Sequence, residues 1–194
     1  MRWTNSLIRT AWPLLLTTLA CSDSTGPAES RPPAQLNILH LSPTAPPLLA
    51  TSTTFDACSG SGGEGHLFFS DGKGGEGEEF ARLTLDNNTL LAKPDGTLFT
   101  PGECIQITMA VDDPTQVLVR LEPSGLRFNP ADPAELRLEY AEAEGVDSTI
   151  EAQIAIWVQE TDGAPFVQIG SALLKDQKEV RASLFGFSRY ALAY

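Results

Sequence analysis

The three cysteines, Cys21, Cys58 and Cys104, are the residues whose chemistry the sequence specifies most directly. A thiol can pair with a second thiol to form a disulfide, can be acylated, or can remain free. An odd number of cysteines leaves one without an intramolecular partner, and in an exported protein that residue needs an explanation. The chemistry of each cysteine therefore depends on whether the chain is exported.

The first twenty residues have the layout of a secretory signal peptide. Residues 1–10 contain Arg2 and Arg9 and no acidic residue, and residues 11–20 (AWPLLLTTLA) form a short apolar run. A membrane-spanning helix needs about twice that length, whereas a basic segment before a short apolar one is typical of a cleaved leader. No later segment is long enough to span a bilayer, so we expect the remainder to be exported and soluble.

The leader ends in residues 18–21 (TLAC), which resemble the lipobox of bacterial lipoproteins. In that family the cysteine receives a diacylglyceryl group and the peptide is cut before it. The resemblance implies that residues 1–20 are a lipoprotein signal peptide and that Cys21 is lipidated, although Thr18 departs from the aliphatic residue that the family prefers. Asp23 would be third rather than second in the mature chain, which favours the outer membrane over the inner one. Ordinary cleavage, giving a secreted or periplasmic protein with a free Cys21 thiol, is the alternative.

Lipidation of Cys21 would leave Cys58 and Cys104 as one pair in an oxidising compartment, where disulfides form and persist. Closing the chain between them would stabilise the domain by about 4 kcal/mol in the chain-entropy model. Two unpaired, buried thiols are the alternative.

Charge and motifs argue against several classes of function. The chain has a net charge of −12, and phosphate backbones repel an acidic protein, so we predict no nucleic-acid partner. The sequence contains no phosphate-binding glycine loop, no Gly-x-Ser-x-Gly and no His-Glu-x-x-His. The chain has only two histidines, and its cysteines lack Cys-x-x-Cys spacing, so the sequence does not contain a typical zinc site. We therefore predict no enzyme, no cofactor, no metal site and no small-molecule substrate.

Residues 60–77 are rich in glycine and acidic residues. Within and just after them, residues 71–79 (DGKGGEGEE) could wrap a calcium ion, because hard cations prefer oxygen ligands. The run lacks D-x-D-x-D-G spacing, and Lys73 lies where a ligand would be needed. We expect a solvated loop interrupted by a short strand at residues 66–69, with a calcium-stabilised surface domain as an alternative.

Residues 21–50 are expected to be a flexible, Pro- and Ser-rich tether between membrane and domain. Residues 22–30 (SDSTGPAES) are small and polar, and prolines follow at several positions up to residue 47. Residues 36–41 (LNILHL) are either a first strand or a docked segment.

Apolar and polar residues alternate from residue 83 onward, which is the period of a half-buried strand. The runs with this pattern or with strand-like composition are residues 105–111, 117–121, 136–140, 152–158, 166–169, 180–185 and 190–194. Only residues 142–145 suggest a helical turn. Short strands separated by turns predict an all-β fold, an antiparallel β-sandwich over residues 51–194 that follows the signal peptide and linker.

Several short motifs resemble the ZU-five domain, the β-sandwich named for zonula occludens and Unc-five proteins. They are residues 94–97 (PDGT), 101–102 (PG), 105–108 (IQIT), 121–128 (LEPSGLRF), 133–136 (PAEL) and 187–193 (FSRYALA). The resemblance spans about residues 85–194 and implies that fold. Pro123 cannot donate to a ladder and Gly125 can take positive φ, so together they end one strand and begin the next, with Leu126 and Phe128 pointing inward.

Some relatives of that fold cut themselves between the Phe and Ser of a His-Phe-Ser sequence. The Ser hydroxyl attacks the preceding carbonyl and the His assists proton transfer, because a hydroxyl is a weak nucleophile without a base. Here Phe187 and Ser188 match, but Gly186 occupies the His position, and His40 and His66 are distant in the sequence. Self-processing is therefore an alternative to the main hypothesis.

The main hypothesis is a lipid-anchored protein of the bacterial cell envelope with a non-catalytic β-sandwich that serves as an interaction or structural module. Its expected partners are the membrane, through the lipid on Cys21, and another protein.

Overall fold

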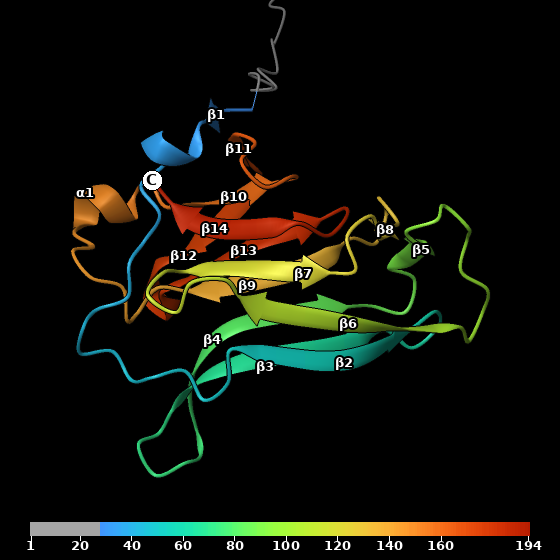
Figure 1. The fold of residues 1–194 in the computed structure, drawn as a ribbon, viewed down its shortest axis with the longest axis horizontal. Coiled ribbons are helices and arrows are strands. Elements are labelled where there is room, and N and C mark those ends of the chain that lie inside the picture. The colour runs from blue at the N-terminus through green and yellow to red at the C-terminus, as the bar shows by residue number, and fades with distance from the viewer. Residues whose placement is uncertain (1–27) are drawn as a thin grey trace, which may run out of the picture.

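The computed structural model describes residues 28–194, which form two antiparallel sheets packed against each other (Figure 1). The predicted all-β sandwich is confirmed. The predicted signal peptide, Cys21 and the first residues of the expected tether lie outside the described residues. Within residues 28–194, no helix is long and apolar enough to cross a bilayer.

The larger sheet has seven strands, and every neighbouring pair in it is antiparallel. In spatial order the strands are β1 (Ser30–Arg31), β11 (Phe166–Gln168), β10 (Ala155–Gln159), β14 (Arg189–Ala193), β7 (Leu118–Glu122), β6 (Cys104–Val111) and β2 (Ser52–Cys58).

The second sheet has five strands, and a small two-stranded sheet lies at one end of the sandwich (Figure 1). The five strands, in spatial order, are β12 (Ser171–Leu174), β13 (Glu179–Leu184), β9 (Ala134–Glu139), β4 (Glu76–Leu85) and β3 (Gly63–Ser70). The small sheet pairs β5 (Leu90–Ala92) with β8 (Arg127–Phe128). The helical elements are η1 (Pro33–Gln35), α1 (Ser148–Glu151) and η2 (Lys175–Gln177).

The core lies between the two large sheets and follows the predicted alternation. Ile107 and Met109 of β6 and Leu136 and Leu138 of β9 are fully buried, while the residues between them point outward. The short helix lies at α1 rather than at residues 142–145. It begins there because the Asp147 carboxylate accepts hydrogen bonds from two amides of the first turn and so caps the helix.

Residues 28–50 belong to the folded domain, so the prediction of a flexible tether is wrong for them. The segment starts with β1 at the edge of the larger sheet and then lies over its outer face. Leu36 packs there with Trp157 and Phe166, and the Arg31 guanidinium lies 5.0 Å from the centre of the Trp157 ring. Leu39 reaches the main core. Isolated bridges rather than a continuous strand hold residues 36–41, so this part is a docked segment.

The glycine-rich stretch is a β-hairpin rather than a solvated loop. Strands β3 and β4 pair along most of their length, and only residues 71–75 form the tip. Leu67 and Phe69 of β3 are buried in the core. Glycine is required at position 65, because a Cβ there would lie 2.3 Å from the Phe55 ring of β2.

The turn between β7 and β8 has the predicted form. Gly125 adopts a φ of 83°, a left-handed conformation that glycine takes without a Cβ penalty. Leu126 and Phe128 after it are buried. This turn and the connection from β13 to β14 together build the cleft described below.

Candidate functional site

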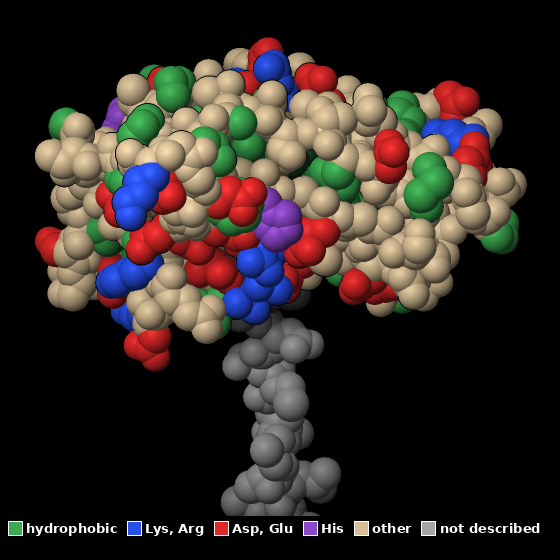
Figure 2. Space-filling model, turned by 90° about the horizontal axis from the view of Figure 1, so that it is seen from below, with side chains coloured by type: hydrophobic (Ala, Val, Ile, Leu, Met, Phe, Trp, Pro, Cys, Tyr) green, Lys and Arg blue, Asp and Glu red, His purple; other side chains and the backbone are tan. Residues whose placement is uncertain are grey.

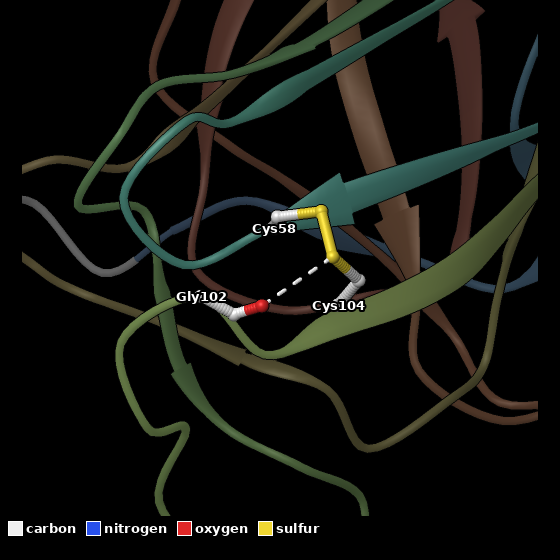
Figure 3. Close-up of a disulfide and its surroundings, with 3 residues drawn as sticks. All are labelled: Cys58, Gly102 and Cys104. Atoms are coloured by element: carbon white, nitrogen blue, oxygen red, sulfur yellow. Dashed lines mark hydrogen bonds between the residues drawn. A yellow bond between two sulfur atoms is a disulfide. The ribbon is translucent and has the colours of Figure 1, made fainter.

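The disulfide joins the ends of two neighbouring strands (Figure 3). Cys58 of β2 and Cys104 of β6 are direct register partners, their sulfur atoms are 2.00 Å apart, and the predicted pair is confirmed. The Gly102 carbonyl oxygen lies 3.7 Å from the Cys104 sulfur. A disulfide sulfur carries no hydrogen, so this is a contact rather than a hydrogen bond. With two cysteines joined, Cys21 remains as the odd cysteine of the sequence.

Ser188 lies beside a cleft of about 410 Å³, here called the Ser188 cleft. Its walls come from the β7–β8 turn, the end of β10, the β11–β12 connection and the β13–β14 connection. They are lined by Gly125, Leu126, Arg127, Val158, Glu160, Ile169, Ser183, Leu184, Phe185, Gly186, Phe187 and Tyr190. Most of these side chains are apolar, so the cleft offers a place for an apolar group with two charged residues at its margin.

The Ser188 hydroxyl donates a hydrogen bond to the Glu160 carboxylate, 3.1 Å away. Tyr190 donates its hydroxyl hydrogen to the Gly186 carbonyl oxygen at 2.7 Å. Burial, together with the nearby Glu160 charge, raises the pKa of Tyr190 well above its ordinary value, so the phenol stays protonated and remains a donor. Phe187 packs edge-on against Phe128 and is buried.

Neither histidine lines the Ser188 cleft. His66 lies on the outer side of the five-stranded sheet, and the backbone of His40 bridges that of Gln116. The group in contact with the Ser188 hydroxyl is therefore a carboxylate, Glu160. A carboxylate in this position can accept the hydroxyl proton, which is the task of a general base.

The acidic hairpin tip is organised by its first residue. Asp71 Oδ1 accepts hydrogen bonds from the amides of Lys73 and Gly75, at 2.7 and 2.8 Å. These two bonds lower the pKa of Asp71 below its ordinary value. Because it holds these two amides, Asp71 acts as a turn residue. Within residues 28–194, no group of three or more His, Cys, Asp or Glu side chains has an arrangement suited to a metal ion.

The outer face of the five-stranded sheet carries a patterned set of charges, here called the charged face. A basic row crosses four strands in direct register and consists of His66 on β3, Arg82 on β4, Arg137 on β9 and Arg181 on β13. Acidic residues lie on both sides of this row: Glu64 and Glu135 on one side, and Glu79, Glu139 and Glu179 on the other. Figure 2 shows acidic and basic side chains gathered around a histidine.

A register shift in β4 places Glu79 on the charged face. Phe80 and Ala81 are consecutive and both buried, so the alternation of β4 breaks between them. An extra residue of this kind reverses which face the preceding residues occupy. Glu79 consequently lies on the same face as Arg82, and the two form an ion pair at 2.9 Å.

Ion pairs tie most of the charged face together. Glu79 also contacts His66 at 2.7 Å, Arg137 pairs with Glu135 at 2.6 Å, and Arg181 pairs with Glu179. The carboxylates of Glu79 and Glu179 are nearly buried, with side chains 10% and 8% exposed. Glu139 has no ion pair or side-chain hydrogen bond within residues 28–194. Partial burial, followed by the charges of Glu79 and Glu179, raises its pKa to about 7.

The comparisons with protein-family models, with curated proteins and with solved structures find no match for the chain. The lipobox and ZU-five resemblances therefore remain predictions from the motifs themselves. Function has to be inferred from the chemistry of the residues described above.

The sequence contained a partial signal for the charged face. Residues 135–139 alternate acidic and basic side chains with buried leucines, which places three charges on one side of a strand. Alternation within one strand does not give the register between strands, however, and the bulge in β4 hides the position of Glu79. The contact between Ser188 and Glu160 left no sequence signal, because the two residues come from different strand ends.

Proposed function

We propose that this chain is an exported protein of the bacterial envelope, anchored through a lipid on Cys21, whose β-sandwich is a non-catalytic interaction or structural module. The observation that carries the proposal is the bond between Cys58 and Cys104. A disulfide of this kind persists in an oxidising compartment, which supports export. It also leaves Cys21 as the odd cysteine, directly behind a leader-like segment.

The docked N-terminal segment limits how far such an anchor would hold the domain from the membrane. The first strand begins at Ser30. A fully extended chain from Cys21 to Ser30 spans at most about 30 Å, so the proposed anchor keeps the sandwich near the bilayer surface. We favour the outer membrane because Asp23 is third in the mature chain; a secreted or periplasmic form is the alternative.

The charged face supports an interaction role for the module. Its arginines come from adjacent, regularly paired strands, so their positions are fixed before any partner binds. Fixed charges of both signs suit a protein partner of complementary pattern. Cross-linking in intact cells should capture less partner with Arg137→Gln than with wild type, whereas Lys73→Gln at the hairpin tip serves as control. Equal capture by both variants would remove the charged face as the contact surface.

Intact mass tests the anchor. The protein is purified without reductant from the membrane fraction of a bacterium that expresses the full chain. We expect a single species that starts at Cys21, carries acyl chains and is two hydrogens lighter than the dithiol. Cys21→Ala should move the protein into the soluble fraction, and the control Ser22→Ala should not. A soluble wild-type protein without lipid would contradict the anchor.

Self-processing between Phe187 and Ser188 is the second candidate, favoured by the hydrogen bond from Ser188 to Glu160. In this reaction the Ser188 oxygen attacks the Phe187 carbonyl carbon while its proton passes to Glu160. The peptide C–N bond then breaks, the freed amine takes a proton, and water hydrolyses the resulting ester.

The same mass measurement separates the two candidates. Self-processing predicts two fragments separated after Phe187, and it predicts that Ser188→Ala and Glu160→Gln each prevent the break. The main proposal predicts one uncut chain. An uncut wild-type chain after prolonged incubation would rule out self-processing without affecting the anchor.

A further inference from the structure

Phe185 is an exposed aromatic residue at the margin of the Ser188 cleft. It directly follows Leu184, the last residue of β13, which is buried in the core, and its own side chain is 59% exposed. Its backbone is fixed, because the Phe185 carbonyl oxygen accepts a hydrogen bond from the Phe128 amide at 3.1 Å. The ring is therefore presented at a defined position beside an apolar cleft.

Two opposite charges line the same cleft. Arg127 and Glu160 both belong to its lining and both are exposed. Arg127 has no ion-pair partner within residues 28–194, and Glu160 accepts only the Ser188 hydroxyl there. A group that enters the cleft would thus meet both a cation and a carboxylate.

This surface is complementary to itself. It carries an exposed ring, Phe185, and a cleft that can receive a ring, and it carries two opposite charges, Arg127 and Glu160, without ion-pair partners within residues 28–194. In a two-fold dimer each surface patch meets its own copy, so residue i of one subunit contacts j of the other, and j contacts i. We propose that the protein forms such a dimer, in which Phe185 of each copy enters the Ser188 cleft of the other. Arg127 of each copy then meets Glu160 of the other.

The partner copy completes the site in this arrangement. The cleft walls include the core residues Leu126, Val158 and Phe187. An incoming phenyl ring would lose its own exposure to water against these walls, and desolvated aromatic anchors commonly carry most of the binding energy of an interface. The proposal does not depend on the lipid at Cys21, so either can fail alone.

Sedimentation of the purified full chain over a wide concentration range tests the dimer. We expect a monomer–dimer equilibrium for wild type, and about thirtyfold or more weaker association for Phe185→Ser. Leu98→Ser is the matched control, because Leu98 is also an exposed apolar residue, 67% exposed, but lies outside the cleft lining. It should associate like wild type. A wild-type protein that is monomeric up to millimolar concentration, or equal association of both variants, would overturn the proposal.

Charge reversal distinguishes contacts between two copies from contacts within one chain, because only contacts between copies can be restored by mixing two variants. Arg127→Glu and Glu160→Arg should each weaken self-association by about tenfold or more, because each places like charges in contact. A mixture of these two variants should associate again, because both intermolecular pairs then join opposite charges. Failure of the mixture to associate more tightly than either variant alone would contradict the proposed contacts, and unchanged melting temperatures would confirm that both variants fold.

Discussion

Glu139 of β9 and Glu179 of β13 face each other as direct register partners on the charged face. Like charges opposed across a sheet repel each other. Glu179 is compensated by its ion pair with Arg181, and Glu79 by its ion pair with Arg82. Glu139 lacks a comparable partner within residues 28–194, so the unfavourable charge of this cluster resides on Glu139.

We predict that Glu139→Gln stabilises the domain at neutral and alkaline pH. The folded-state pKa of Glu139 is raised from 4.5 to about 7, so folding favours the protonated carboxyl. Ionised Glu139 lowers the free energy of unfolding. This loss is absent below about pH 4.5, grows as the pH rises toward 7, and is constant above about pH 7. Because Glu139 is only partly buried, we discount the full value for solvent screening and expect a gain of about 1–2 kcal/mol at pH 8.

Urea unfolding between pH 4.5 and pH 8, without reductant, measures this prediction. Glu135→Gln is the matched control, because Glu135 lies on the same strand and face but pairs with Arg137. The control should show no gain that grows with pH. A difference between Glu139→Gln and wild type that is the same at every pH would show that repulsion at Glu139 is not its cause.

Removing the disulfide should destabilise the domain strongly. Cys58 and Cys104 close a loop with a sequence separation of 46, and losing that constraint on the unfolded chain costs about 4 kcal/mol in the chain-entropy model. Cys58→Ser and Cys104→Ser should give similar urea midpoints, and the double variant should be no less stable than either. A non-reduced wild type with the same midpoint as the variants would show that the bond contributes nothing.

The docked N-terminal segment should contribute to stability rather than serve as a spacer. Leu36 packs against Trp157 and is buried, so Leu36→Ala should cost about 2–3 kcal/mol. Leu49→Ala is the control: Leu49 is 44% exposed, and the cost there should be within about 0.5 kcal/mol. Trp157 is the only tryptophan within residues 28–194, and a protein that begins at Cys21 therefore reports on Trp157 alone. Its fluorescence should shift to longer wavelength in Leu36→Ala if the segment loosens, and an unchanged spectrum and midpoint would contradict the packing.

The sequence predicted those parts of the fold in which one face of a strand is apolar and the other polar. Residues 105–111 lie within β6 and residues 136–140 overlap most of β9, because the inner residues of both strands face a single core. Residues 28–50 were not predicted to belong to the fold, because a proline-rich segment held by isolated bridges has no period to detect. Strand β10 does not show a buried face and an exposed face. All of its residues are buried, because the docked segment covers its outer face, including Trp157.

The candidate sites were predictable to different extents for a similar reason. Cysteine chemistry is carried by residue type, so the pair could be inferred before the fold was known. Ser188 was recognised through a motif, but its partner Glu160 is brought to it only by the packing of two strand ends. The charged face depends on register across four strands and on a bulge, neither of which is encoded in a single run of residues.

The β3–β4 hairpin gives the sharpest contrast between a loop and a core element. Its composition suggests a solvated loop, yet Leu67 and Phe69 are buried and β4 contributes the centre of the charged face. We predict that deleting residues 60–77 prevents folding, because it removes β3 and exposes the core behind it. Replacing only the tip, residues 71–75, by Asn-Gly should preserve the fold, because that dipeptide favours the tight turn of a two-residue hairpin.

Circular dichroism and a urea titration of the two deletion variants distinguish a core hairpin from a dispensable loop. The tip replacement should unfold cooperatively near the wild-type midpoint, whereas the longer deletion should show no cooperative transition. The urea midpoint of Asp71→Ala should lie close to that of wild type, because water can replace the lost acceptor for the exposed amides of Lys73 and Gly75. A longer deletion that unfolds at the wild-type midpoint would show that β3 adds nothing to the core, and the burial of Leu67 and Phe69 would then have no energetic meaning.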